Sequence, residues 1–305
     1  MNEEVGRKID WWEVLNEREG TYEKEGRLSD LWRLQNMIML AIRKADPTTK
    51  VGGPAMTWPK PSWVESYLKA SVTQISFITW HNYASGNASD TNAQVLAKPD
   101  TLAGHAADVL KLIPKFAGDR IIETFLTEFN ISWSWKTRDP RMVNHLGAVF
   151  DAMVVKRLAE LGVTGIAKWH VKDGIYGMLG SDNKLRPSGV LYQWSRPMLT
   201  GMMVTVDSPR PAEVEALAVQ REDGSRSILV INKVTSRAKV GLPTELLGIK
   251  TGDVVQIRVI DESTTQSSKA VVLQAVAGEE LVVPGYSVTL LTTVPAEVVE
   301  STKFY

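Results

Sequence analysis

Two glutamates that each lie near the end of an apolar stretch are the residues best suited to chemistry. Glu17 closes residues 11–17, and Glu128 lies within residues 125–130. Both stretches read as strands, and the carboxyl ends of parallel strands meet at one edge of a sheet. Two carboxyl groups facing each other there suit glycoside hydrolysis: one protonates the leaving oxygen, and the other attacks the anomeric carbon or activates water. Either glutamate alone would more often be a solvated strand end, but the matched pair favours a site.

Composition excludes several other classes of function. The chain has 305 residues, 44% of them hydrophobic, with 35 basic and 35 acidic side chains. It therefore supports a real core but provides no basic field for nucleic acid, and no apolar run is long enough to cross a membrane. Cysteine is absent and no histidine pair has metal-ligand spacing, so we expect neither a disulfide, a metal nor another cofactor. The charged start lacks a signal-peptide core, which predicts a cytoplasmic protein.

Tryptophan is concentrated in the first part of the chain. Nine of the ten tryptophans precede residue 170. Aromatic rings at this density suit a sugar-binding cleft, although most could equally be core residues. His170 follows the last strand of this region and is a candidate to line the cleft. The tryptophans at or just after strand ends, which could stack on sugars, are Trp80, Trp133, Trp135 and Trp169.

Alternating strands and helices must position these side chains. Up to about residue 200 the hydrophobic pattern predicts strands at 9–16, 50–54, 75–83, 121–131 and 165–171. Between them it predicts helices at 28–45, 62–70, 101–116 with a break at Pro114, from Pro140 to 161, and 189–199. This alternation predicts an α/β fold with a parallel sheet, too short for an eight-stranded barrel.

The pattern changes near residue 200. Short strands separated by turn residues are predicted at 213–220, 225–232, 239–242, 254–261, 270–275 and 287–293. This pattern is typical of an all-β sandwich. We therefore expect two domains, 1–200 and 201–305.

Several motifs resemble known glycosidases. Residues 12–17, Trp-Glu-Val-Leu-Asn-Glu, are similar to the Trp-Glu-x-x-Asn-Glu segment of the clan A retaining (β/α)8 glycosidases. Residues 51–55, 77–83 and 126–130 follow at spacings that resemble glycoside hydrolase family 39, the β-xylosidase and α-L-iduronidase family. The resemblance implies a TIM-type barrel containing strands four to eight, followed by the accessory sandwich.

The resemblance also implies roles for individual residues. Glu17 would be the acid/base and Glu128 the nucleophile of a retaining, double-displacement mechanism. Asn16 would hold the sugar 2-hydroxyl, and His81 and Tyr83 would line the site and tune the nucleophile. The full set expected to bind a carbohydrate substrate is Asn16, His81, Tyr83, Trp80, Asn130, Trp133, Trp169 and His170.

The sequence departs from the family at its start. Only eight residues precede the fourth-strand match, Arg18 stands in place of the usual proline, and Leu15 stands where tryptophan is common. Five strands cannot close a barrel built for eight, so two edges would be open. Glu13 would point inward as a buried carboxylate without a partner.

Something should therefore cover the open side of the sheet. Self-association, a complementing chain, or a truncated reading frame could each account for it, and we expect a homo-oligomer through the open barrel edges. The predicted function is a β-xylosidase-like hydrolase in truncated form. The alternative is an impaired, non-enzymatic sugar-binding or self-assembling remnant of one.

Overall fold

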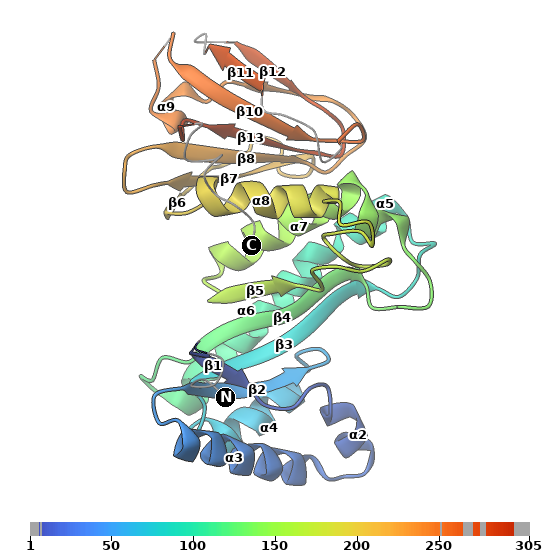
Figure 1. The fold of residues 1–305 in the computed structure, drawn as a ribbon, viewed down its shortest axis with the longest axis vertical. Coiled ribbons are helices and arrows are strands. Elements are labelled where there is room, and N and C mark those ends of the chain that lie inside the picture. Colours follow the sequence, from blue (N-terminus) through green and yellow to red (C-terminus); the bar gives the residue numbers. More distant parts are fainter. Residues whose placement is uncertain (1–5, 7, 251, 265–270, 275–278, 296–305) are drawn as a thin grey trace. The chain divides into compact units, whose positions relative to one another are not determined.

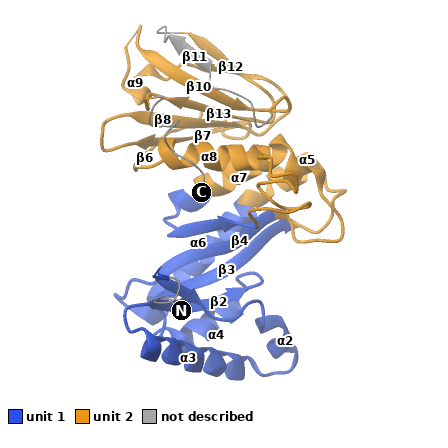
Figure 2. Cartoon of the chain, in the orientation of Figure 1, with its two compact units in different colours: residues 1–84, 100–130, 157–169 blue, residues 85–99, 131–156, 170–305 orange. Residues whose placement is uncertain are grey.

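The computed structural model describes residues 6, 8–250, 252–264, 271–274 and 279–295. The chain forms two compact units, coloured separately in Figure 2. One contains residues 1–84, 100–130 and 157–169, and the other contains residues 85–99, 131–156 and 170–305. This partition does not test the predicted domains 1–200 and 201–305, which stay a prediction.

A five-stranded parallel sheet carries the candidate site. Its strands follow one another in chain order across the sheet, β1-β2-β3-β4-β5 (Figure 1). Registers such as Trp11 beside Lys50 and Phe125 beside Gly165 are parallel. The predicted incomplete TIM-type barrel is therefore confirmed. The strands are β1 (Trp11–Glu13), β2 (Lys50–Met56), β3 (Phe77–Ser85), β4 (Glu123–Ser132) and β5 (Gly165–Lys168).

Helices connect the strands, and the helices of the first unit cover one face of the sheet. The helices α3 and α4 pack together through Trp32, whose indole N–H donates to Ser66 Oγ at 2.8 Å. In β3, Asn82 points to α6, where its Oδ1 lies 2.8 Å from Nδ1 of His105. The helices are α2 (Glu19–Lys24), α3 (Leu28–Ala45), α4 (Pro61–Ser71), α5 (Asn92–Leu96), α6 (Lys98–Ala117), α7 (His145–Glu160) and α8 (Pro187–Met198). None of these helices, nor any other in the described ranges, combines the length and apolarity needed to cross a bilayer.

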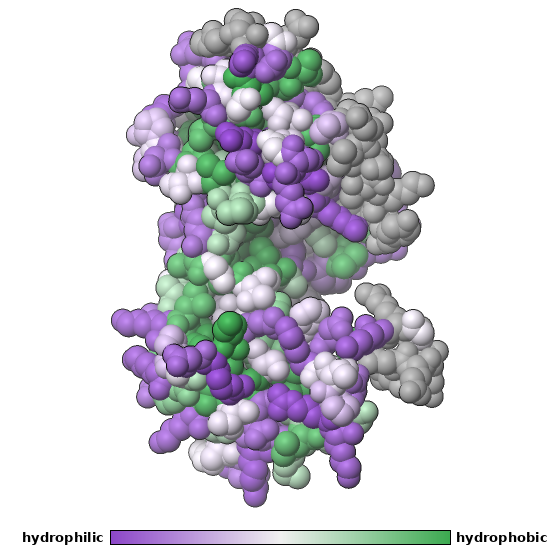
Figure 3. Space-filling model, turned by 90° about the vertical axis from the view of Figure 1, so that its left-hand side faces the viewer, coloured by the Kyte–Doolittle hydropathy of each residue, from purple (hydrophilic) through white to green (hydrophobic). Residues whose placement is uncertain are grey.

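The opposite face of the sheet, which we call the open face, carries aromatic and acidic side chains. Phe125 packs edge-to-face against both Phe77 and Trp11, with ring centroids 5.5 and 6.5 Å apart. Lys50 and the Trp11 indole N–H both bind the carboxylate of Glu123, at 2.5 and 3.0 Å. These contacts leave Trp11 47% exposed. The space-filling view in Figure 3 shows hydrophobic residues gathered among hydrophilic ones on the surface of the first unit, which contains this sheet.

Several predicted boundaries were wrong. The first strand stops at Glu13, because Leu15 and Glu17 take left-handed backbone angles, φ 66° and 51°. The last strand of the parallel sheet, β5, stops at Lys168 and so excludes the predicted residues 169–171. The expected break at Pro114 does not occur, since α6 continues to Ala117. Pro114 has no backbone N–H, so the helix lacks one backbone hydrogen bond there but does not end.

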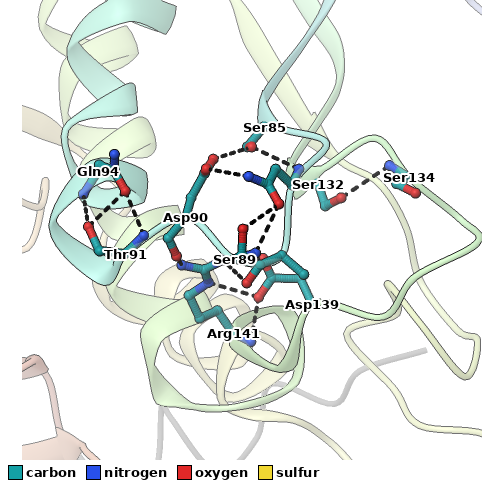
Figure 4. Close-up of polar contacts among 11 residues, drawn as sticks. Ser85, Ser89, Asp90, Thr91, Gln94, Ser132, Ser134, Asp139 and Arg141 are labelled. Atoms are coloured by element: carbon teal, nitrogen blue, oxygen red, sulfur yellow. Dashed lines mark hydrogen bonds and ion pairs between the residues drawn. The ribbon is translucent and has the colours of Figure 1, made fainter.

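The helix predicted from Pro140 is two elements, and its first turn forms a buried clamp. Pro140–Val143 form a 3-10 turn, and α7 starts separately at His145. Asp139 caps the turn as predicted and binds the Arg141 guanidinium through both carboxylate oxygens, at 2.8 and 2.6 Å. Arg141 also donates to the carbonyl oxygen of Asp90 (Figure 4). This buried pair ties the loop after β3 to the loop after β4 within the second unit.

The C-terminal region is a sandwich, as predicted. A six-stranded antiparallel sheet has the order β11-β10-β13-β8-β7-β6, and β9 pairs with β12. Ala238 of β9 and Val283 of β12 share one buried core with Val230 of β8. The short strands β6 and β12 and the helix α9 (Thr244–Leu247) were not predicted. The strands are β6 (Met202–Val204), β7 (Val214–Gln220), β8 (Arg226–Asn232), β9 (Ala238–Gly241), β10 (Val254–Ile260), β11 (Val271–Gln274), β12 (Glu280–Val283) and β13 (Ser287–Thr292).

Candidate active site

Glu17 is presented by a tight turn after β1. Its backbone N–H donates to the Ala55 carbonyl oxygen at 3.0 Å. Glu17 and Leu15 both have positive φ, which is uncommon for residues with a side chain and marks local backbone strain. The turn brings Glu17 Oε1 to 2.7 Å from Nδ1 of His81. Asn16 lies exposed between the two left-handed residues.

Glu128 reaches the same place from β4 because of a bulge. The pairing of β4 with β5 shifts register between Leu126 and Phe129. Strict alternation would place Glu128 on the opposite face from Thr127, but a bulge adds one residue and re-aims the side chain. Glu128 Oε2 then accepts a hydrogen bond from the Tyr83 hydroxyl at 2.8 Å and lies 3.5 Å from His81 Nδ1.

The two carboxylates are close together around a buried histidine. The offered oxygens of Glu17 and Glu128 and Nδ1 of His81 all lie within 4.8 Å of one another. The His81 side chain is 1% exposed, against 36% for Glu17 and 15% for Glu128. Retaining glycosidases place their two carboxyl groups about 5–5.5 Å apart, and inverting ones about 6.5–9.5 Å apart. The spacing therefore suits direct attack by one carboxylate on an anomeric carbon.

Burial is the largest influence on the protonation of Glu128. Removal from water raises the pKa of the Glu128 carboxyl above its ordinary value. The charge of His81 and the hydrogen bond from Tyr83 lower this pKa, while the charges of Glu17 and Glu13 raise it, and the net direction is upward. His81 and Tyr83 thus favour the ionised form of Glu128, while burial and the two neighbouring carboxylates favour its protonated form.

The same three side chains could also offer ligands to a metal ion. One nitrogen and two carboxylate oxygens at this separation are a donor set that divalent ions such as Zn²⁺ accept. His81 Nδ1 is already within hydrogen-bonding distance of Glu17, so a metal would have to displace that contact.

The expectation that Glu13 is buried without a partner was wrong. Glu13 is exposed on the open face, and its Oε1 accepts a hydrogen bond from the Thr127 hydroxyl at 2.9 Å. The open side of the sheet leaves this carboxylate in contact with solvent. Its desolvation cost is therefore small in this structure.

Trp80 was predicted to contact the sugar on the open face, and this prediction was wrong. It is 1% exposed in the helix-covered core. Period-2 alternation along β3 already separates it from His81 and Tyr83, which project to the other face. Asn130 is also fully buried: its Oδ1 accepts from Lys168 Nζ at 3.2 Å, and its Nδ2 donates to the Trp169 carbonyl oxygen at 2.5 Å.

Trp169, whose carbonyl oxygen accepts the hydrogen bond from Asn130, has an exposed side chain. Its indole is 39% exposed, and its backbone N–H donates to the Phe129 carbonyl oxygen at 3.0 Å. Asn130 therefore fixes the backbone that carries Trp169 rather than offering its own amide to a ligand.

Trp133 and His170 belong to the second compact unit. The Trp133 ring is 63% exposed and packs on Gly86, where a Cβ would lie 2.2 Å from the indole. The Tyr176 hydroxyl donates to the Trp133 carbonyl oxygen at 3.0 Å, and His170 Nε2 lies 2.9 Å from Asp173 Oδ2. The contacts of the first unit thus bring together Glu17, His81, Tyr83 and Glu128. Asn16 is exposed next to Glu17 in the chain, and Trp169 follows β5 in the same unit.

Removing the Tyr83 hydroxyl should change the pH dependence of any reaction that needs ionised Glu128. Tyr83→Phe removes a hydrogen bond that lowers the pKa of Glu128, so this pKa should rise further. The acidic limb of a kcat/KM profile should then move to higher pH. Tyr22→Phe, the same chemical change on α2, is the matched control and should leave the limb in place. An acidic limb that does not move in Tyr83→Phe would contradict this assignment.

An open parallel barrel whose strands bring two carboxylates together is an arrangement that glycoside hydrolysis can use. Residues 8–173, more than half of the chain, match Glycosyl hydrolases family 39. The chain belongs to this family, as the motifs at residues 12–17 and 126–130 predicted. No curated protein matches the sequence.

Solved structures with a similar fold include glycosidases. A family 51 arabinofuranosidase from Xanthomonas axonopodis pv. citri matches 94% of this chain and 66% of its own, with TM-score 0.72 and 13% identity. A family 44 endoglucanase from Clostridium thermocellum matches 93% and 66%, with TM-score 0.70 and 14% identity. A monomeric β-xylosidase from Caulobacter crescentus CB15 matches 87% and 65%, with TM-score 0.60 and 15% identity. The chain thus spans just under two thirds of the length of these proteins, and at such identities the likeness shows the fold alone.

Proposed function

We propose that this chain is a retaining glycoside hydrolase with Glu17 as acid/base and Glu128 as nucleophile. The observation that carries the proposal is the approach of the two carboxylates to within 4.8 Å around His81. Glu17 lies beyond the carboxyl end of β1, and Glu128 lies in the carboxyl-terminal half of β4. Barrel enzymes place their catalytic groups toward these ends of the strands.

The reaction would proceed in two steps. Glu17 gives its proton to the glycosidic oxygen while Glu128 attacks the anomeric carbon, so the alcohol leaves and a glycosyl ester forms on Glu128. Glu17 then takes a proton from water, whose oxygen attacks the same carbon and releases Glu128. Tyr83 orients the nucleophile by its 2.8 Å hydrogen bond, and His81 lies against both carboxylates.

The remaining predicted residues would bind the sugar. Asn16, exposed beside Glu17, would hold the 2-hydroxyl, and the exposed ring of Trp169 would stack on a pyranose face. We propose a β-xyloside as the substrate. The motif spacing and the fold shared with the Caulobacter β-xylosidase support this choice.

A panel of aryl glycosides tests the function. We expect turnover of 4-nitrophenyl β-xyloside, with retained configuration when product formation is followed by proton NMR. Titration calorimetry with xylose and xylobiose on the same protein separates the alternative. Binding without turnover of any aryl glycoside would favour a non-enzymatic sugar-binding role.

We also propose that the chain self-associates through the open barrel edges. Among the described residues, β1 and β5 have a neighbouring strand on one side only, and Trp11 is 47% exposed on the open face. Unpaired strand edges readily recruit another strand. Light scattering at micromolar concentration should give a mass above that of one chain, and Trp11→Gln should lower it. Leu40→Lys, which changes an exposed apolar residue of α3, is the control. A clean monomer mass for the wild type would contradict the proposal.

A further inference from the structure

The ladder between β1 and β2 lacks one donor just before the turn that carries Glu17. The Lys50 N–H donates to the Asp10 carbonyl oxygen at 2.8 Å, and the Val14 N–H donates to the Gly52 carbonyl oxygen at 3.0 Å. The same parallel register assigns the Val14 carbonyl to the N–H of residue 54. Residue 54 is proline, which has no N–H. Regular pairing therefore cannot satisfy the Val14 carbonyl.

A glutamine from a helix supplies the missing donor. Gln35 Nε2 of α3 donates to the Val14 carbonyl oxygen at 2.9 Å, and the Gln35 side chain is fully buried. Its Oε1 has no hydrogen-bond partner in the described part of the chain. Burying a half-satisfied amide costs stability, so packing alone does not explain a glutamine here.

Gly53 makes room for this amide. A Cβ at Gly53 would lie 2.3 Å from Gln35 Nε2 and 3.0 Å from the Val14 carbonyl oxygen. The residue also has φ +151°, which side chains other than hydrogen rarely allow. The backbone of β2 is thus shaped to admit the Gln35 amide beside Val14.

Contacts further along the turn tie it to the end of β2 and to the residue that follows. The Glu17 N–H donates to the Ala55 carbonyl oxygen at 3.0 Å, and the Thr57 N–H donates to Oε1 of fully buried Glu19 at 2.7 Å. Between the Gln35 and Glu19 contacts lie the left-handed residues Leu15 and Glu17. Such strain persists only where surrounding contacts hold it.

We propose that Gln35 is a positioning residue for the acid/base. Its amide replaces the donor that Pro54 lacks and fixes the turn that aims Glu17 at His81. The inference rests on the catalytic role proposed for Glu17. The sequence carried one signal for it: Gln35 occupies a polar position four residues after Leu31 and three before Ile38, on the apolar stripe of its helix.

Leaving-group dependence distinguishes positioning from general structural support. Gln35→Met keeps the length of the side chain but removes the donor, and Gln35→Leu is a second apolar variant. For phenyl β-xyloside, whose leaving group needs a proton, kcat/KM should fall by about 10-fold or more. For 2,4-dinitrophenyl β-xyloside, which needs little acid assistance, the fall should be only about 2-fold. An equal loss on both substrates would overturn the proposal.

A neighbouring amide on the same helix provides the control. Asn36 Nδ2 donates to the Ala70 carbonyl oxygen at 3.0 Å, the same kind of bond but directed at α4. Asn36→Leu should change kcat/KM equally for both substrates, and by less than about 2-fold.

A readout without substrate separates this inference from the proposed function. Hydrogen exchange of the Glu17 amide, followed by NMR, should be at least about 10-fold faster in Gln35→Met than in the wild type and unchanged in Asn36→Leu. Unchanged exchange in Gln35→Met would refute the positioning role, whether or not the protein hydrolyses glycosides. If exchange is faster in Gln35→Met but the protein hydrolyses no glycoside, Gln35 still holds the turn in place, and the catalytic role of Glu17 is rejected.

Discussion

Glu128→Ala is expected to lower kcat for 4-nitrophenyl β-xyloside by at least about 10⁴-fold, because it removes the group that forms the bond to the anomeric carbon. The fold should survive, since Glu128 is partly buried with a raised pKa and its neutral replacement relieves the cost of a desolvated charge. Stopped assays with the purified variant measure the residual rate.

Azide sharpens the test of Glu128. The cavity left by the missing carboxylate admits azide to the face of the sugar that Glu128 would attack. Azide should therefore restore turnover and give a glycosyl azide of inverted configuration. The matched control is Glu123→Gln, five residues earlier on β4, where the carboxylate binds Lys50 and Trp11 instead. Wild-type turnover in Glu128→Ala would remove this residue from the mechanism.

The sequence predicted the order of elements in the barrel and the two carboxylates. The strands predicted at 50–54, 75–83 and 121–131 match β2, β3 and β4, and the helical period of residues 28–45 matches α3. Both glutamates could be found because strand ends in such a sheet share one edge.

Other features of the site depend on tertiary contacts that no local pattern encodes. The bulge between Leu126 and Phe129 turns the Glu128 side chain to the other face of the sheet. The left-handed φ of Leu15 ends β1 earlier than predicted. Both are local departures from regular strand geometry that neighbouring strands impose. Trp80 is different, because alternation with His81 could have assigned it to the core from the sequence.

Glu17→Ala is expected to give a loss that depends on the leaving group. General acid catalysis contributes about 10²–10⁴-fold, so kcat/KM for phenyl β-xyloside should fall by that amount. With 2,4-dinitrophenyl β-xyloside the first step should remain fast, and the glycosyl ester on Glu128 should accumulate because no base activates water. A burst of dinitrophenolate, or the ester mass on the intact protein, measures this accumulation.

Azide should act on Glu17→Ala in the opposite sense to Glu128→Ala. It would enter from the side of the missing acid/base and attack the glycosyl ester, so the glycosyl azide should keep the configuration of the substrate. Glu25→Ala, an exposed glutamate paired with Arg27 beyond α2, is the control and should change neither rate nor product. The two stereochemical outcomes together assign each carboxylate to its own side of the anomeric carbon. Inverted azide product from Glu17→Ala would exchange the two roles, because the nucleophile would then be the residue whose loss opens the attacking face.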